Sequence, residues 1–188
     1  MIPTSQFLRE ATKDAHVNTE KAANLKSLFQ LPFNRVEYAD LLAANYLVWS
    51  TLALALQGKA TAANLPGTNL LKAVDHLAVD LEKLGMSPLK AAVGLPELSG
   101  NPEVFGSAYV LYGSTLGSRY IYRAFKKQLG EEGESILGFY RFCATQPAKF
   151  WPEFQTVLNQ VISTEGDQQR AAAAANAVFK AFEKAYQL

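Results

Sequence analysis

The spacing of apolar residues constrains this chain more than any other feature of its sequence. Apolar side chains recur every three or four residues through most of its length, which is the spacing of one face of an α-helix. β-Branched residues are scattered, and no stretch alternates apolar and polar positions for long, as a half-buried strand would. The pattern therefore predicts an all-α fold built from several packed helices.

The predicted helices follow one another without an internal repeat or a linker. Thr4 is expected to cap the first helix, and Asn34 with Glu37 is expected to form a capping box at the start of the second. The helices are predicted over residues 4–29, 34–57, 69–84, 101–130, 134–144 and 167–186, with shorter ones starting at Ser87 and Pro147 and a turn over 58–67. With 188 residues, the chain is expected to form one domain, residues 1–188, whose core is large enough to enclose a ligand.

Charge and composition exclude several classes of function. The formal net charge is +1 and no run of lysine and arginine is long, so neither nucleic acid nor a membrane surface is an expected partner. Cys143 is the single cysteine, which rules out an internal disulfide and fits a reducing cytoplasm. Charged residues over 9–14 interrupt the apolar core that a secretory signal needs. The uncharged run between Asp40 and Lys59 contains Asn45 and other polar residues, which favours a central helix of a soluble bundle over a membrane span.

One stripe of charged residues carries a histidine. Arg9, Lys13, His16 and Glu20 follow one another at spacings of four, three and four, which places all of them on one face of a helix. Taken alone, the stripe fits a solvated surface ridge best, and it also fits a ligand site. In the second case a neutral imidazole is a suitable axial ligand for heme iron, and Glu20 is placed to fix its tautomer.

A second segment breaks the pattern of a plain bundle. Gly113 and Gly117 lie inside the long predicted helix, where each glycine costs roughly 1 kcal/mol relative to alanine. Their spacing of four places them on one face, with Gly106 on nearly the same stripe, so a strip of the helix carries no side chains. Two explanations remain open: close packing against another helix, or a bent backbone that approaches a flat ligand.

The two segments together resemble a known family. The sequence from Leu8 to His16, Leu-Arg-Glu-Ala-Thr-Lys-Asp-Ala-His, followed by Glu20, is similar to the proximal helix of heme oxygenases, nearest their bacterial branch. The segment from Tyr109 to Arg119, Tyr-Val-Leu-Tyr-Gly-Ser-Thr-Leu-Gly-Ser-Arg, resembles their glycine-rich distal helix. The order and separation of the segments also fit, and a weaker likeness covers most of the chain.

The resemblance implies roles for residues on both helices. His16 would be the axial ligand of the heme iron, and Arg9 and Lys13 would bind the propionates. Glu20 and Tyr109 would complete the heme-binding residues. On the other side, the backbone at Gly113 and Gly117 would cross the distal face of the heme in a glycine-kinked helix.

The sequence departs from the family pattern at three positions. Ser114 stands where many members have an acidic residue that organises distal water, and Ser118 occupies the second position of the usual glycine pair. Both serines are therefore candidate residues of the catalytic face. Pro152 follows Trp151 where a basic anchor is often found, so Lys149, Arg119 or Arg123 would have to substitute for it.

The resemblance also implies a reaction and its partners. Heme would be both substrate and cofactor, cleaved by dioxygen to biliverdin, carbon monoxide and ferrous iron. The sequence has no flavin or nicotinamide fingerprint, so electrons would come from an external reductase or ferredoxin. A cytoplasmic monomer is the expected form. The alternative on the same fold is a carrier or sensor that binds heme or a bilin without turnover.

Two other residues, His76 and Cys143, are candidates for a site but are assigned no functional role. His76 has acidic neighbours, but adjacent positions on a helix face apart, so it is expected to be a surface or interhelical histidine. A di-iron site is not indicated, because neither His16 nor His76 has an acid three residues before it. Cys143 lies among aromatic residues and is expected to be part of the core.

Overall fold

The computed structural model describes residues 2–63, 65 and 69–188, and every regular element in these ranges is a helix. The elements are α1 (Thr4–Ala11), α2 (Lys13–Ala22), α3 (Leu25–Leu28), α4 (Arg35–Ala63), α5 (Leu70–Lys83), α6 (Asn101–Gly133), a 3₁₀ turn η1 (Glu134–Ile136), α7 (Gly138–Ala144), α8 (Phe150–Val161) and α9 (Glu165–Ala185). The predicted all-α fold is confirmed.

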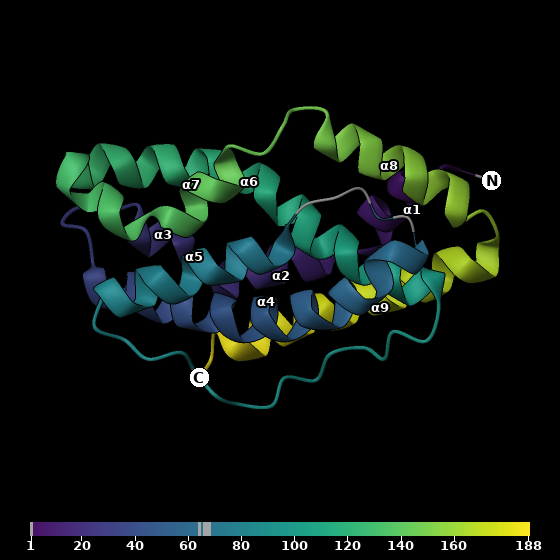
Figure 1. Cartoon of the computed structure of the whole chain (residues 1–188), viewed down its shortest axis with the longest axis horizontal. Helices are drawn as coiled ribbons and strands as arrows, with labels where there is room; N and C mark the ends of the chain where they lie inside the picture. Colours follow the sequence, from purple (N-terminus) through teal and green to yellow (C-terminus); the bar gives the residue numbers. More distant parts are fainter. Residues whose placement is uncertain (1, 64, 66–68) are drawn as a thin grey trace.

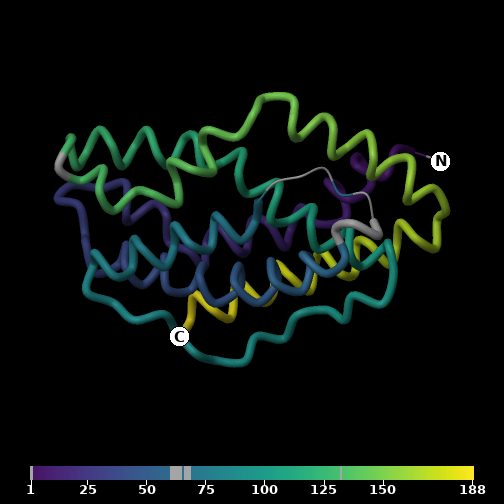
Figure 2. Tube along the Cα trace, viewed as in Figure 1, coloured from purple at the N-terminus to yellow at the C-terminus, as the bar shows by residue number. Residues whose placement is uncertain are grey.

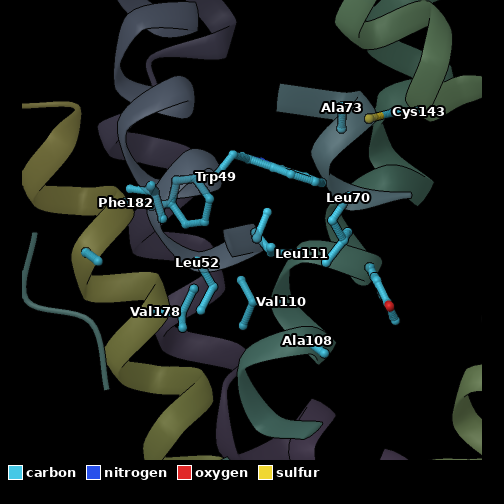
Figure 3. Close-up of a cluster of buried hydrophobic side chains, with 14 of the residues drawn as sticks. Trp49, Leu52, Leu70, Ala73, Ala108, Val110, Leu111, Cys143, Val178 and Phe182 are labelled. Carbon is cyan, nitrogen blue, oxygen red and sulfur yellow. The ribbon is translucent and has the colours of Figure 1, made fainter. Parts of the chain in front are cut away.

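The long helices α4, α5, α6 and α9 lie side by side and enclose the core, while α1 and α2 pack along α9 (Figure 1). The core is closed by apolar side chains from α4, α6 and α9, including Trp49, Leu111, Val178 and Phe182, all nearly excluded from solvent (Figure 3). Burial of this kind is the main favourable term in folding. The helical faces predicted from apolar spacing therefore do meet in a single core.

The contact between α6 and α9 is exceptionally close at one point. A Cβ atom on Gly106 would lie 2.1 Å from the backbone oxygen of Ala171, which no real side chain tolerates. Nearby, Arg170 of α9 donates two hydrogen bonds to the Glu103 carboxylate of α6, at 2.8 and 3.0 Å. Of the two explanations for the glycine stripe, close helix packing is therefore the correct one at Gly106.

The predicted first helix over 4–29 is wrong as a continuous element. Thr12 separates α1 from α2 with φ −109° and ψ 3°, and its hydroxyl donates to the Leu8 carbonyl oxygen at 2.7 Å. Such bonding of a threonine back onto the helix competes with regular helical geometry. Asn24, at φ 48°, separates α2 from α3. Thr4 is not the N-cap either, because its hydroxyl donates to the carbonyl oxygen of Ile162.

The start of α4 confirms Asn34 as the predicted N-cap, while Glu37 accepts from the Asn34 side-chain amide, at 2.8 Å, instead of from its backbone N–H. The side-chain oxygen of Asn34 accepts from the backbone N–H groups of Val36 and Glu37, at 3.1 and 3.2 Å. The helix continues past its predicted end at residue 57 as far as Ala63. Of the turn predicted over 58–67, residues 64 and 66–68 lie outside the described residues.

The short helix predicted from Ser87 does not form. Residues 86–99 are non-helical and run along the molecule from the end of α5 to the start of α6 (Figure 1). An extended segment can span this length. A helix of the same number of residues would be too short, because it rises only about 1.5 Å per residue. The cap of α6 is Gly100, one residue before the predicted Asn101.

The long helix α6 is continuous through Gly113 and Gly117, where the sequence predicts a kink. Its trace changes direction along its length (Figure 2), but the residue with non-helical dihedral angles is Gly130, at φ 64° and ψ −162°. The backbone of α6 is therefore helical through both glycines, and the change of direction of the trace is a curvature of the helix. Helices of this length commonly curve in this way.

One helical stretch among the described residues, Arg35–Lys59, is long and apolar enough to cross a membrane, with a mean hydropathy of 1.4. Of its most apolar part, 67% is buried inside the protein. In this structure, α4 therefore has the packing of a core helix.

Candidate functional site

A cavity of about 590 Å³ lies between α2 and α6, with α4, α7 and α9 behind it. This volume is within the range typical of small-molecule and cofactor sites, roughly 300–1,000 Å³. All nine residues that the sequence singles out for a ligand site line this cavity: Arg9, Lys13, His16, Glu20, Tyr109, Gly113, Ser114, Gly117 and Ser118. The structure thus brings together two segments about a hundred residues apart.

His16 stands on α2 at the open side of the cavity. Its Nδ1 atom lies 3.7 Å from a carboxylate oxygen of Glu20, and the two side chains are 57% and 61% exposed. The imidazole ring packs edge-on against Phe179 of α9, with the ring centroids 5.7 Å apart. Because Nδ1 is on the Glu20 side, Nε2 lies at the opposite edge of the ring, available to a ligand.

The facing wall is the glycine-bearing part of α6. A Cβ atom added at Gly117 would meet nothing within 4 Å, and one at Gly113 would make ordinary contact with the Trp151 ring at 3.6 Å. Both positions line the cavity, unlike Gly106, which packs on α9. A flat ligand can therefore lie against the α6 backbone at Gly117 with no side chain between them.

The serine hydroxyls on this wall are turned back onto the helix. The Ser114 hydroxyl donates to the Leu111 carbonyl oxygen at 2.8 Å, and the Ser118 hydroxyl donates to the Ser114 carbonyl oxygen at 3.1 Å. Both hydroxyl hydrogens are thus used within α6. Each serine still offers an oxygen lone pair, so in this arrangement neither is a hydrogen donor to a molecule in the cavity.

One end of the cavity is cationic. Arg9 and Lys13 line it beside Tyr109, whose hydroxyl is hydrogen-bonded to the side chain of Thr12. Burial raises the pKa of the Tyr109 phenol, so it stays neutral at physiological pH. The Tyr109 ring lies 5.4 Å from the Trp151 ring, which closes this end.

The substitute anchors considered from the sequence lie elsewhere. Arg119 donates to the carbonyl oxygens of Ala144 and Gln146, at 3.2 and 2.8 Å, and so ties α6 to the segment after α7. Lys149 pairs with Glu153 at 3.4 Å. Neither cation is among the residues that line the cavity, whose arginine and lysine residues come from α1 and α2.

Sequence reasoning missed a buried polar group at the other end of the cavity. The Tyr186 hydroxyl donates to the side-chain oxygen of Asn45 at 2.7 Å, and the Asn45 amide is also hydrogen-bonded to Tyr140. All three residues line the cavity, and burial raises the pKa of both phenols. No pattern in the sequence links them, because they come from three helices that meet only in the fold.

Two other candidate residues lie where the sequence predicts, Cys143 in the core and His76 between helices. Cys143 is 1% exposed, and burial raises the pKa of its thiol to about 12, so the thiolate is scarce. His76 packs against the Phe142 ring at 5.1 Å between centroids, and burial lowers its pKa. Neither residue lines the cavity between α2 and α6.

Fold and site together define an all-helical protein with a cofactor-sized cavity between a histidine-bearing helix and a glycine-bearing helix. A family model described as Heme oxygenase matches residues 3–187. The chain is 34% identical over 116 residues to a heme oxygenase of Xanthomonas campestris, covering 62% of this chain and 68% of that one. The chain belongs to the heme oxygenase family.

Solved structures agree with this assignment at the level of the fold. A heme oxygenase structure from Neisseria meningitidis, described with NO and CO bound, aligns with a TM-score of 0.77 at 21% identity, covering 100% of this chain and 94% of that one. A heme oxygenase from Leptospira interrogans aligns with a TM-score of 0.73 at 21% identity and covers both chains completely. The protein is an enzyme of heme degradation, which yields biliverdin, carbon monoxide and iron.

Proposed function

We propose that this enzyme holds heme between α2 and α6, with His16 as the axial ligand of the iron and Arg9 and Lys13 as partners of the propionates. The backbone at Gly113 and Gly117 then lies across the opposite face of the macrocycle. This assigns a role to each of the two unusual segments of the sequence.

The observation that carries the proposal is the meeting of these segments across one cavity. His16 and Gly117 belong to helices far apart in the chain, yet both line the same space. The space in front of Gly117 is open, as a flat ligand requires, while the cations Arg9 and Lys13 are grouped toward one end, as propionates require.

Heme fits these residues by its chemistry. A neutral imidazole is a common axial ligand of heme iron, and a carboxylate near its other nitrogen raises its basicity and fixes its orientation. Glu20 is in that position relative to His16, at 3.7 Å from Nδ1. The apolar rings of Trp49, Phe139 and Phe182 complete a wall suited to a macrocycle that is mostly hydrocarbon.

The protein contributes orientation and shape to the reaction. Bound heme supplies the iron at which dioxygen is activated once electrons arrive. With heme bound, His16 would hold the iron, Arg9 and Lys13 would hold the propionates and so the rotation of the ring, and the glycine-bearing wall of α6 would limit the space beside it. Holding the ring in one fixed orientation in this way favours attack at one of its edges over the others.

The electrons come, in this proposal, from a separate reductase or ferredoxin, and the enzyme works as a cytoplasmic monomer. The single cysteine supports a reducing compartment, because it is buried and has no partner with which to form an internal disulfide. Chromatography of the purified protein at several concentrations checks the monomer directly.

The axial ligand is tested by His16→Ala, with His76→Ala as the matched control. Loss of the iron–imidazole bond is expected to shift and weaken the Soret band of the hemin complex, and added imidazole is expected to restore it. His76→Ala leaves the band unchanged, because His76 is outside the cavity. A normal Soret band in His16→Ala would show that another group ligates the iron.

A further inference from the structure

The two ends of the cavity differ in chemistry, and α6 runs from one end to the other. Tyr109 and Ile121 both line the cavity and are twelve residues apart on this helix, which corresponds to about 18 Å. At the Tyr109 end, the Tyr109 hydroxyl bonds to Thr12 and lies in the field of Arg9. This is the cationic end.

The residues near Ile121 belong to the opposite end. Ser118, one turn before Ile121, is hydrogen-bonded to Cys143 of α7, and Tyr140 lies one turn before Cys143 on that helix. The Tyr140 ring also packs on Phe125 of α6, with the centroids 5.8 Å apart. Tyr140 is therefore remote from Arg9 along the length of α6.

Helix α9 shows the same order. The Asn176 side chain donates to the Ala11 carbonyl oxygen of α1 at 3.2 Å, and the Thr19 hydroxyl of α2 donates to the Phe179 carbonyl oxygen at 3.2 Å. Tyr186 follows at the end of α9, beyond Phe179 and the His16 ring that packs on it. Tyr186 thus lies at the end of the cavity away from α1 and its Arg9.

Asn45, Tyr140 and Tyr186 form one hydrogen-bonded unit, here called the amide–phenol cluster. The Asn45 oxygen accepts from Tyr186, and the Asn45 side chain also interacts with the Tyr140 phenol. Tyr140 and Asn45 are only 4% and 6% exposed. Among the hydrogen bonds of the described residues, none is donated by the Tyr140 hydroxyl, and Tyr140 lines the cavity, so this hydroxyl can donate to a molecule there.

Heme itself has no hydrogen-bond acceptor for the Tyr140 hydroxyl at this end of the cavity. Its two propionates flank one meso carbon, so binding them at Arg9 and Lys13 turns the opposite meso edge, which is entirely hydrocarbon, toward the amide–phenol cluster. A buried donor that faces hydrocarbon is unfavourable by several times the thermal energy. Cleavage at that edge changes the situation, because the open bilin carries two lactam carbonyl oxygens there, and these accept hydrogen bonds.

We propose that the amide–phenol cluster is a binding subsite for the lactam oxygens of the bilin product, with Tyr140 as the donor and Asn45 and Tyr186 as positioning residues. This inference rests on the proposed placement of the propionates at Arg9 and Lys13. The subsite favours the biliverdin isomer opened at the meso carbon opposite the propionates, because only that isomer places its lactam oxygens at this end of the cavity, where one of them can accept from Tyr140.

The test uses the apoprotein, titrated separately with biliverdin IXα and with hemin, and followed by quenching of tryptophan fluorescence, since Trp49 and Trp151 line the cavity. Tyr140→Phe is expected to weaken biliverdin binding about fivefold to tenfold, the value of one buried hydrogen bond. Hemin binding is expected to change by less than about twofold, because hemin makes no such bond. Tyr186→Phe, which releases Asn45, is expected to weaken biliverdin binding in the same selective way.

Tyr38→Phe is the matched control. Tyr38 is as buried as Tyr140 and packs on it at 6.3 Å, but its hydroxyl donates to the Ile136 carbonyl oxygen and it does not line the cavity. The affinities for biliverdin and for hemin should both be unchanged in Tyr38→Phe. Equal losses for biliverdin and hemin in Tyr140→Phe, or no loss in either, would overturn the subsite. Failure of hemin to bind the wild-type protein would instead overturn the proposed function.

Discussion

Gly117→Ala tests whether this glycine is needed for close helix packing or for contact with a flat ligand. A Cβ atom at Gly117 meets nothing within 4 Å, because the position faces the cavity. The apoprotein then gains the helix propensity of alanine, about 1 kcal/mol, with no steric cost. For a domain of this size, that gain raises the melting temperature by about 2 to 4 °C.

Gly106→Ala is the matched substitution on the same helix. Its Cβ atom would lie 2.1 Å from the Ala171 carbonyl oxygen, and the atoms in the way are backbone, which no rotamer change can move. Overpacking of about 1 to 3 kcal/mol, or more, outweighs the propensity gain. The melting temperature of this variant is therefore expected to fall.

Gly117→Ala is expected to weaken heme binding even though it stabilises the apoprotein. The added methyl group occupies space that the account gives to the macrocycle, so hemin affinity is expected to fall about tenfold, which corresponds to about 1.4 kcal/mol of crowding. Thermal unfolding of the apoprotein and hemin titration of the same preparations measure both effects. A Gly117→Ala variant that is less stable without heme, or that binds hemin normally, would refute the assignment of this face to the ligand.

Three further predictions concern other parts of the molecule. Because burial raises its pKa to about 12, the Cys143 thiol should not react with a disulfide reagent at pH 8 until the protein is unfolded. Asp80 accepts from the backbone N–H groups of Gly138 and Phe139 at 3.0 and 2.8 Å, so Asp80→Ala should lower the free energy of unfolding in urea by about 2 to 4 kcal/mol. Replacing Arg9 and Lys13 together by alanine should weaken hemin binding about tenfold or more, whereas unchanged affinity would make them a solvated surface.

The candidate site was predictable from sequence because its two main segments each carry a local signal. The stripe with His16 has helical spacing, and Gly113 with Gly117 is costly inside a helix. Spacing alone did not decide between packing and ligand contact, since Gly106 lies on nearly the same stripe as Gly117. The surroundings of each glycine decide between the two explanations. Gly106 packs against the Ala171 backbone, whereas Gly117 faces the open cavity.

Other features depend on contacts that no local pattern encodes. The helix is interrupted at Thr12, where the Thr12 hydroxyl donates to the Leu8 carbonyl oxygen. Threonine does not form this bond in every helix, so the interruption cannot be read from the residue type. The amide–phenol cluster joins three helices through one asparagine, and each of its members is unremarkable in its own segment. Asp80 caps α7 from a helix more than fifty residues earlier. Long-range hydrogen bonds of this kind become visible only once the helices are packed.

The central claim is tested most directly by a single turnover of bound heme. The purified protein is mixed with one equivalent of hemin, a reductant such as ascorbate or a ferredoxin system is added under air, and absorption spectra are recorded. The account predicts loss of the Soret band together with a rising red absorption of biliverdin. A Soret band that persists through reduction and exposure to air would contradict it and would point to a carrier or sensor of heme.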